Sequence, residues 1–345
     1  MSGEATLDRS VIEIDLEAVR QNAQVLVRAL QGSELWAVVK ADGYGHGAAD
    51  VGRAAVEGGA RALCVTTVEE GLSLRRELRG IRILVLGPAT GRSIADACDA
   101  DLELAVADYP VPDGVRVHLK LETGMGRYGL GELAPPPANV VGLMSHLATA
   151  ASNEDFARRQ IERFVEATAA YPQLTRHIAN SAAALRLPES RFDAARCGIA
   201  LYGLSPFGTD PADDGLQPVL RWRSRLAHVK RLEPGESTGY GRSFVAARPT
   251  WIGIVPVGYA DGFRRDFTGT EVLVDGERRR VVGAVSMDSF AVELDREVPV
   301  DTRVTLIGDG LLAEEHARAA GTIGYEIVTL VQSAPTRSRR TAVDG

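Results

Sequence analysis

The sequence predicts an α/β protein, in which an N-terminal (β/α)8 TIM-like barrel is followed by a mainly β C-terminal domain. Three observations favour this fold class. Short apolar runs alternate with amphipathic stretches up to about residue 200, and a Pro-, Gly- and Asp-rich segment follows at residues 207–216. Beyond that segment, strand-like runs follow one another with little helix between them. The length of 345 residues suits two domains, which we expect at residues 1–215 and 216–345.

Eight apolar, β-leaning runs define the expected barrel. They lie at residues 35–39, 62–67, 81–87, 102–107, 115–122, 140–147, 176–180 and 194–201. Amphipathic stretches that suit helices separate several of them, at residues 47–58, 68–78 and 153–170. Alternation of strand and helix indicates a parallel sheet, and eight such strands suit a closed barrel. An open doubly wound sheet predicts the same alternation and stays an alternative at this point.

Five strand-like runs and one helix define the expected C-terminal domain. The runs lie at residues 220–232, 251–257, 271–274, 279–294 and 303–307. Asp275 and Gly276, between two of these runs, form a favourable hairpin turn. The helix is expected near residues 313–320.

Composition and charge narrow the class of protein. Basic residues number 39 and acidic residues 46, which gives a net charge of −7 and argues against a general nucleic-acid-binding surface. Cys64, Cys98 and Cys197 are widely spaced and include no CxxC motif, so we expect neither a disulfide framework nor a cysteine-rich zinc site. A small-molecule enzyme or binding protein in a reducing compartment fits these features.

Other patterns bear on location and metal binding. Residues 1–16 hold no basic segment followed by an apolar one, and no run approaches the roughly 18 apolar residues of a membrane helix. We therefore expect a cytoplasmic protein with no signal peptide and no membrane partner. Because the sequence holds no HxxxH, HExxH or GxSxG pattern, we expect no catalytic zinc ion and no nucleophilic serine of that type.

Polar residues collect where the expected barrel strands end. Lys40, Lys120, His146 and Ser181 each lie at or just beyond the end of a run, and Arg196 lies within the eighth. In a barrel these residues would surround the carboxyl-terminal mouth, where enzymes of this fold keep their active sites. Taken singly, His146 fits a buried core histidine equally well.

Lys40 ends a nearly all-apolar run, where a charged side chain is costly unless it has a task. A desolvated lysine loses basicity, which suits it to Schiff-base chemistry with an aldehyde cofactor. A lysine that reaches from a strand end into water is the alternative. The glycines around Tyr44 would let the backbone approach a ligand, and Tyr44 could donate to a phosphate.

The segment GMGRYG, residues 124–129, matches the GxGxxG pattern of dinucleotide-binding folds. It follows the fifth run rather than the first, and no acidic residue stands about 20 positions further on. We therefore discount an NAD-dependent dehydrogenase, which stays as an alternative from another enzyme class.

The segment AVVKADGYGHG, residues 37–47, closely resembles the cofactor-lysine signature of the alanine racemases, which use pyridoxal 5'-phosphate. Further motifs follow in the order found in that family, and the likeness extends from about residue 11 to residue 325. They are LKLETGMGRYGL, MSHLATA, HIANSAA, ARCGIALYGLSP, STGYGRSF, VPVGYADGF and VGAVSMD.

The resemblance implies racemisation of L- and D-alanine by a two-base mechanism, which would supply D-alanine for peptidoglycan. Lys40 would carry the cofactor as a Schiff base, and the partner's Tyr240 would be the second base, in a head-to-tail homodimer whose C-terminal β domains complete each other's active sites. The family's pattern gives the remaining roles: Tyr44, Ser181, Gly198 and Ile199 at the phosphate, His146 by the ring, Arg196 at the pyridine nitrogen, Arg127 and the partner's Met287 at the substrate carboxylate, and Lys120 as a lysine that is often carbamylated.

These roles are chemically coherent, because racemisation needs one base on each face of the substrate carbon. An unperturbed tyrosine has a pKa near 10, so a basic Tyr240 needs help from a network such as His146 and Arg196.

The sequence departs from the family's pattern at three places. Glu122 and Ser286 replace residues that are more often Asp and Cys, and Ser333 lies near the place of a C-terminal tyrosine. A smaller residue there would enlarge the pocket, so a broader amino-acid racemase, for example one acting on serine, is an alternative. A non-catalytic cofactor-binding paralogue is a further alternative, although such a carrier needs Lys40 and not Tyr240.

Overall fold

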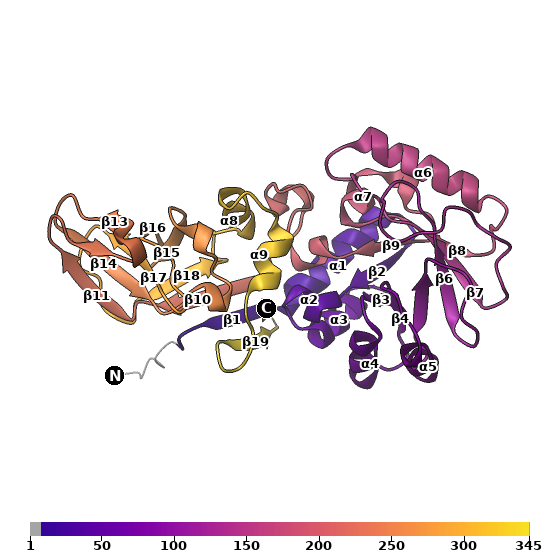
Figure 1. Ribbon diagram of the computed structural model, residues 1–345, viewed down its shortest axis with the longest axis horizontal. Helices are drawn as coiled ribbons and strands as arrows, with labels where there is room; N and C mark the ends of the chain where they lie inside the picture. Colours follow the sequence, from indigo (N-terminus) through magenta and orange to yellow (C-terminus); the bar gives the residue numbers. More distant parts are fainter. Residues whose placement is uncertain (1–7, 345) are drawn as a thin grey trace. The chain divides into compact units, whose positions relative to one another are not determined.

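The structure of the protein, a computed structural model, describes residues 8–344. The chain forms two compact units, each drawn in Figure 1. One unit is Leu16–Gln217, and the other joins the described residues up to Asp15 to the chain from Pro218 onward. Residues 1–7, part of the segment used to judge the presence of a signal peptide, lie outside the described residues.

The first unit is a closed barrel of parallel strands, as the sequence predicted, and the open doubly wound alternative is wrong. Each strand pairs with the next one along the chain, and β9 closes the barrel against β2. The strands, each within a predicted run or one residue beyond it, are β2 (Glu34–Val38), β3 (Ala62–Val65), β4 (Arg82–Val85), β5 (Glu103–Val106), β6 (Arg116–Lys120), β7 (Val140–Met144), β8 (Thr175–His177) and β9 (Ala194–Cys197).

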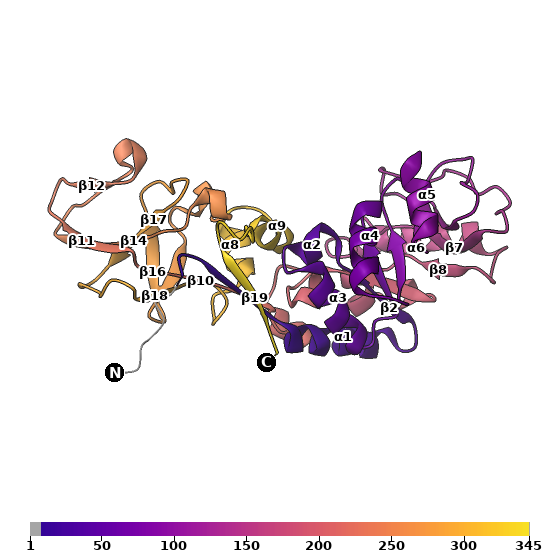
Figure 2. The ribbon, with the colours of Figure 1, turned by 90° about the horizontal axis from the view of Figure 1, so that it is seen from below.

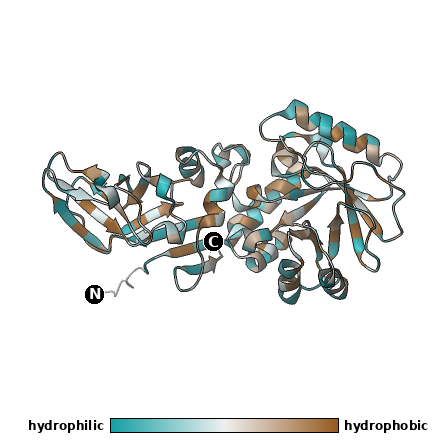
Figure 3. Ribbon diagram, in the orientation of Figure 1, coloured by the Kyte–Doolittle hydropathy of each residue, from teal (hydrophilic) through white to brown (hydrophobic). Residues whose placement is uncertain are grey.

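Helices surround this barrel on its outside (Figure 1). They are α1 (Leu16–Leu30), α3 (Ala48–Glu57), α4 (Val68–Glu77), α5 (Arg92–Asp99), α6 (Glu154–Thr168) and α7 (Ser181–Arg186). The short α2 (Lys40–Tyr44) follows β2 directly and is not a regular helix, because three of its residues have left-handed backbone angles. Local signals explain the starts of α4 and α6: Thr67 and Glu70 form a capping box, and the Asn153 side chain caps Phe156. In Figure 3 the ribbon of α6 carries both hydrophilic and hydrophobic colours, and the helix buries Ile161 and Phe164. None of the helices in residues 8–344 has the length and apolar character that crossing a membrane requires.

The barrel unit differs from the expected residues 1–215 at both ends. Residues 207–216 do not form a free linker, because they contain a short 3-10 turn at Pro211–Asp214 and bury Leu216. Residues 8–15 belong instead to the second unit, where β1 (Val11–Asp15) pairs with β10 and β19. These partners lie more than two hundred residues away in the sequence, so local pattern could not place this strand.

The second unit is built on a nine-stranded sheet in the order β11-β14-β17-β16-β15-β18-β10-β1-β19. Two short strands, β12 (Ser237–Thr238) and β13 (Phe244–Val245), pair only with each other in a separate two-stranded sheet. They lie between β11 and β14 in the sequence. The other strands after Gln217 are β10 (Leu220–Arg225), β11 (His228–Leu232), β14 (Thr250–Val255), β15 (Glu271–Val274), β16 (Glu277–Val282), β17 (Phe290–Leu294), β18 (Arg303–Ile307) and β19 (Arg339–Val343).

The predicted mainly β character of this unit is confirmed, although the structure divides two of the predicted runs and adds strands and a helix that were not expected. The runs at residues 220–232 and 279–294 are each two strands, because the chain changes sheet partners after β10 and turns at Gly283, which has a φ of +69°. A second helix, α9 (Gly324–Leu330), follows the expected one, α8 (Ala313–Ala319). The predicted hairpin turn at Asp275 and Gly276 joins β15 and β16.

Candidate active site

The polar residues that the sequence singled out lie at the carboxyl ends of the barrel strands. Lys40 begins α2 after β2, Lys120 ends β6, and His146 lies two residues beyond β7. Ser181 begins α7 after β8, and Arg196 lies in β9, one residue before that strand ends. Because all strands of a parallel barrel point the same way, these residues surround one mouth.

The backbone turns in an unusual way directly after β2. Ala41, Asp42 and Gly43 all adopt left-handed angles, with φ values of 53°, 49° and 62°. For residues other than glycine this conformation costs on the order of 1 kcal/mol each. A carboxylate oxygen of Glu70 accepts a hydrogen bond from the backbone nitrogen of Ala41 at 2.6 Å and holds the turn. Backbone strain of this kind is concentrated at functional sites. The strained turn that begins at Lys40 is therefore a candidate for such a site.

Four residues form a small group that we call the cradle: Tyr44, Ser181, Gly198 and Ile199. The backbone N–H of Gly198 donates to the Ser181 hydroxyl at 3.0 Å. A Cβ atom at position 198 would collide with the Tyr44 hydroxyl and lie 2.9 Å from its Cζ atom, so only glycine permits this approach. Ile199 follows, buried, at the start of a 3-10 turn. The cradle therefore combines hydroxyl groups with backbone N–H groups.

Arg196 is buried and held by hydrogen bonds from both terminal nitrogens. Nη1 donates to the Nδ1 atom and the carbonyl of His177 at 2.7 and 2.9 Å, and Nη2 donates to the carbonyl of Ser145 at 2.7 Å. Nη2 also lies 3.3 Å from Nδ1 of His146. None of the contacts found for Arg196 among residues 8–344 uses its Nε–H, which is therefore available to a ligand.

His146 has a defined protonation pattern. A guanidinium can only donate, so Nδ1 of His146 accepts from Arg196 and the ring proton lies on Nε2. Burial, followed by the charge of Arg196, lowers the pKa of His146 to about 3, so the ring is neutral at physiological pH.

Basic side chains dominate the electrostatics of the mouth. Burial, followed by the charge of Arg127, lowers the pKa of Lys40, and the same two causes lower the pKa of Lys120 to about 8. Lys120 lies close enough to Lys40 and to Arg196 for their charges to interact. Such a site favours an anionic ligand, and its lysines lose their protons more readily than usual.

The loop of residues 124–129 wraps around the carboxylate of Glu122. The backbone N–H groups of Gly124, Met125 and Gly126 donate to it at 2.5, 2.6 and 3.0 Å. Burial alone would raise the pKa of Glu122, but these hydrogen bonds lower it below its ordinary value. The amides that would bind a dinucleotide phosphate are thus occupied by the Glu122 side chain, which precedes the loop. The GxGxxG match is not a dinucleotide site.

In the second unit, Tyr240 and Met287 lie on neighbouring loops. Tyr240 follows β12 and is 72% exposed, and Met287, between β16 and β17, is 53% exposed. A Cβ atom on Gly239 would lie 2.7 Å from the backbone nitrogen of Ala284, so the two loops touch through their backbones. Figure 2 shows the segment around β12 projecting from the main sheet. Such exposed aromatic and apolar side chains suit contact with a partner.

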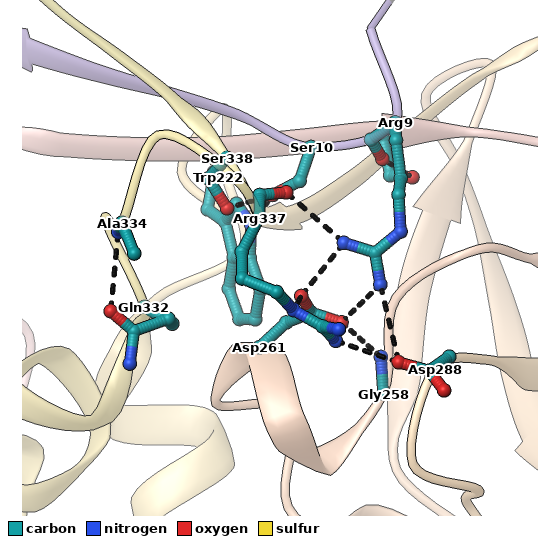
Figure 4. A network of polar contacts seen from close by, with 11 residues as sticks. Arg9, Ser10, Trp222, Gly258, Asp261, Asp288, Gln332, Ala334, Arg337 and Ser338 are labelled. Atoms are coloured by element: carbon teal, nitrogen blue, oxygen red, sulfur yellow. Dashed lines mark hydrogen bonds and ion pairs between the residues drawn. The ribbon is translucent and has the colours of Figure 1, made fainter.

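Asp261 secures the loop beside Met287 (Figure 4). Its buried carboxylate accepts two hydrogen bonds from Arg9, at 2.8 and 2.7 Å, and one from Arg337 at 2.8 Å. It also accepts the backbone N–H of Gly258 at 2.9 Å. Gly258 in turn packs against the backbone of Met287, because a Cβ atom there would lie 2.5 Å from the Met287 carbonyl carbon. Asp261 therefore connects Arg9 and Arg337 to Gly258, and Gly258 packs against the backbone of Met287.

Comparison with known proteins decides the family. The family model described as alanine racemase, N-terminal domain, matches residues 14–206, and the model described as alanine racemase, C-terminal domain, matches residues 219–339. The chain belongs to the alanine racemase family. Enzymes of this family are isomerases that act on amino acids, and the chain is an enzyme of this class.

Individual alanine racemases resemble the chain over nearly its whole length. Alanine racemase 1 of Bacillus subtilis (strain 168) is 38% identical over 93% of this chain and 90% of its own length, and alanine racemase of Symbiobacterium thermophilum is 40% identical over 92% and 93%. Among solved structures, alanine racemase from D-cycloserine-producing Streptomyces lavendulae superposes with a TM-score of 0.91 at 35% identity, covering 99% of this chain and 98% of the other. The enzyme from Streptomyces coelicolor A3(2) gives 0.89 at 38% identity, covering 98% of both chains.

Several residues that shape the site escaped the sequence analysis. Glu70 and Asp261 act on backbone groups, and a carboxylate in an ordinary helix or loop gives no local signal of that task. Glu122 was noted only as a departure from the alanine racemase pattern, although it organises the loop that carries Arg127. His177 lies in β8, and its sequence position does not distinguish it from a hydrogen-bonded histidine of the barrel core.

Proposed function

We propose that the protein interconverts L-alanine and D-alanine with pyridoxal 5'-phosphate as its cofactor. The observation that carries the proposal is the position of Lys40, at a strained turn in the barrel mouth, with a pKa lowered by burial and by Arg127. A lysine of this kind attacks an aldehyde readily and gives up its proton more readily than an ordinary lysine. The names of the relatives support alanine as the substrate.

The residues of the mouth fit the cofactor. The hydroxyl and backbone N–H groups of the cradle would hold its phosphate, and Lys40 would hold it covalently. His146 would lie beside the ring, and the available Nε–H of Arg196 would face the pyridine nitrogen. When bound, pyridoxal phosphate would spread the negative charge that remains on the substrate carbon after its proton is removed. A cationic Arg196 would keep the pyridine nitrogen unprotonated, which would limit side reactions such as transamination.

Two bases would serve the two faces of the substrate carbon. Lys40 would remove or deliver the proton on one face, and the partner subunit's Tyr240 would do so on the other. The Nε2–H of His146 would donate a hydrogen bond to the tyrosine oxygen, and the contact of Arg196 with Nδ1 would hold that ring in place. The hydrogen bond from the neutral His146 ring and the positive charge of Arg196 would stabilise the phenolate form that Tyr240 needs in order to act as a base.

The substrate carboxylate would bind to Arg127 with the help of the partner subunit's Met287. We include carbamylation of Lys120 in the proposal, because a pKa of about 8 leaves part of this lysine neutral near pH 7.5. The neutral amine would add to CO2, forming an N–C bond and releasing one proton. The resulting carboxylate would replace a positive charge beside Arg127 with a negative one and orient its guanidinium.

The proposal includes a head-to-tail homodimer in which each C-terminal β domain completes the partner's site. The high exposure of Tyr240 and Met287 supports it, since catalytic groups this exposed need a covering surface. We also propose a cytoplasmic enzyme whose D-alanine is used for peptidoglycan, with no nucleic-acid or membrane partner.

Serine is the alternative substrate. Ser333, near the place where the family has a tyrosine, is a small residue whose hydroxyl lies 3.4 Å from Nη1 of Arg340. A pocket bounded by serine rather than tyrosine would admit a larger side chain.

The test combines colour with activity. The purified protein is expected to absorb visible light through its bound cofactor and to form D-alanine from L-alanine faster than it racemises serine. The Lys40→Ala variant is expected to lose both properties. A protein that stays colourless after incubation with pyridoxal phosphate would contradict the proposal, and a coloured protein that prefers serine would contradict only the substrate. A coloured protein without racemase activity would favour a non-catalytic carrier.

A further inference from the structure

A line of buried polar side chains crosses the barrel from the mouth toward its opposite end. It starts at Arg196, whose Nη1 atom lies 2.7 Å from Nδ1 of His177. It continues from Nε2 of His177 to Nδ1 of His118 at 2.9 Å, and from Nε2 of His118 to a carboxylate oxygen of Glu103 at 2.9 Å. None of the four side chains belongs to a residue more than 4% exposed. We call this line the histidine relay.

The two ends of the relay fix the direction of every hydrogen bond in it. Arg196 can only donate, so Nδ1 of His177 accepts and its ring proton lies on Nε2. That proton is donated to Nδ1 of His118, whose own proton must then lie on Nε2 and be donated to Glu103. Burial lowers the pKa of both histidines, which keeps the rings neutral. Each donor therefore points away from the mouth and toward the carboxylate.

The imidazole rings are locked in these positions. Trp36 contacts both, with ring centroids 5.6 Å from His118 and 4.5 Å from His177. Gly142 in β7 leaves room for His118, since a Cβ atom there would collide with its Nδ1 atom. Neither ring can turn over to exchange a nitrogen for a carbon without moving the barrel core.

We propose that Glu103 is a positioning residue for the reaction, acting on Arg196 through His118 and His177. Its carboxylate is the fixed acceptor that keeps Nδ1 of His177 free of a proton and thereby able to hold the guanidinium of Arg196. Arg196 in turn keeps the orientation in which Nη1 and Nη2 make its hydrogen bonds and its Nε–H is left for a ligand. The inference rests on the proposed function, in which that N–H meets the cofactor.

Glutamine at position 103 would reverse the relay. Nε of Arg116 donates to the second carboxylate oxygen of Glu103 at 3.0 Å, and Nε of Arg82 lies 3.5 Å from the same oxygen. Because arginines only donate, the glutamine carbonyl must face them and its NH2 group must face His118. Nε2 of His118 would then have to accept, which moves the proton of each histidine to Nδ1. A protonated Nδ1 on His177 would oppose the Nη1 donor of Arg196 and displace it.

The experiment observes the ring nitrogens of the full-length holoenzyme by 15N NMR with labelled histidine. In the wild type, His118 and His177 are expected to carry their protons on Nε2, with Nδ1 unprotonated. In Glu103→Gln both are expected to carry them on Nδ1. The cofactor absorbance is expected to shift, kcat for alanine to fall on the order of 10- to 100-fold with KM little changed, and transamination to rise.

Asp101→Asn is the matched control. Asp101 also pairs with Arg116, at 2.9 Å, but it is exposed and lies outside the relay. Its substitution removes one negative charge from the same end of the barrel and is expected to leave the histidine signals, the absorbance and kcat at wild-type values.

Either of two results would overturn the inference. One is a wild-type His118 or His177 with its proton on Nδ1 or on both nitrogens. The other is a Glu103→Gln variant whose histidine signals and cofactor absorbance match the wild type. Both readouts are independent of which amino acid the enzyme racemises, so failure of the inference is distinguishable from failure of the proposed substrate.

Discussion

At Gly198, the addition of a single methyl group would disturb the proposed cofactor site. An alanine methyl group there would collide with the Tyr44 hydroxyl and push it out of the cradle. We expect Gly198→Ala to weaken the affinity for pyridoxal phosphate by about 10-fold or more, which corresponds to about 1.4 kcal/mol. Titration of the apoenzyme with the cofactor, followed by visible absorbance, measures this change.

Gly131→Ala is a suitable comparison, because a Cβ atom at position 131 would meet nothing within 4 Å. It lies in the same unit and is expected to bind the cofactor as the wild type does. Equal affinities for the two variants would mean that Tyr44 and Gly198 take no part in holding the phosphate.

At the scale of elements, the start of α4 supports the turn of α2. One oxygen of Glu70 accepts the N–H of Ala41, and the other accepts the backbone N–H groups of Thr66 and Thr67. The amide of Glu70→Gln would turn an NH2 group toward one of these donors. We expect the variant to be less stable by about 1–2 kcal/mol, because one backbone N–H loses its acceptor. Urea unfolding of both proteins measures the difference.

Glu69→Gln removes the same charge from the same helical turn, and the Glu69 carboxylate takes no part in these bonds. Its stability is expected to stay within about 0.5 kcal/mol of the wild type. The Glu70 charge also raises the pKa of Lys40, so Glu70→Gln is expected to lower that pKa further. A Glu70→Gln protein as stable as Glu69→Gln would show that the left-handed turn holds itself.

The elements that the sequence could predict are those whose signal is local. Barrel strands such as β3 and β4 are buried on both faces and therefore read as apolar runs, which made the closed barrel predictable. The pairing of β1 with β10 and β19 depends on partners that are remote in sequence, and no local pattern reports it. Most of the mouth residues were predictable because they end or follow strands. The other three members of the histidine relay, Glu103, His118 and His177, lie in strands without any such signal.

At the scale of the whole molecule, Asp261 links parts of the second unit that are remote in the chain. Two arginines, Arg9 and Arg337, donate to this carboxylate, which is fully buried. Asp261→Asn would leave both guanidinium groups facing an amide that accepts with one oxygen only. Because breaking a buried ion pair leaves charge uncompensated, we expect a loss of about 3 kcal/mol in the free energy of unfolding of this unit at pH 7.

Acid provides a second test of the same carboxylate. Burial alone would raise the pKa of Asp261, but the hydrogen bonds from Arg9, Gly258 and Arg337 lower it below its ordinary value. A carboxyl group with a depressed pKa in the folded state stabilises that state above its unfolded pKa of about 3.9, and the contribution is lost as the pH falls through the folded value. The difference in unfolding free energy between wild type and Asp261→Asn is therefore expected to be constant from neutral pH to about pH 5 and to shrink below about pH 4.

Asp288→Asn separates burial from charge. Asp288 pairs with the same Arg337 at 2.8 Å, but its side chain is 61% exposed. Exposed pairs contribute about 1 kcal/mol or less, so this variant is expected to lose no more than that and to show little dependence on acid. Urea unfolding from pH 3 to pH 7 compares the three proteins. If Asp288→Asn lost as much unfolding free energy as Asp261→Asn, the exposed ion pair of Arg337 would stabilise this unit as much as the buried carboxylate does. That result would contradict the prediction.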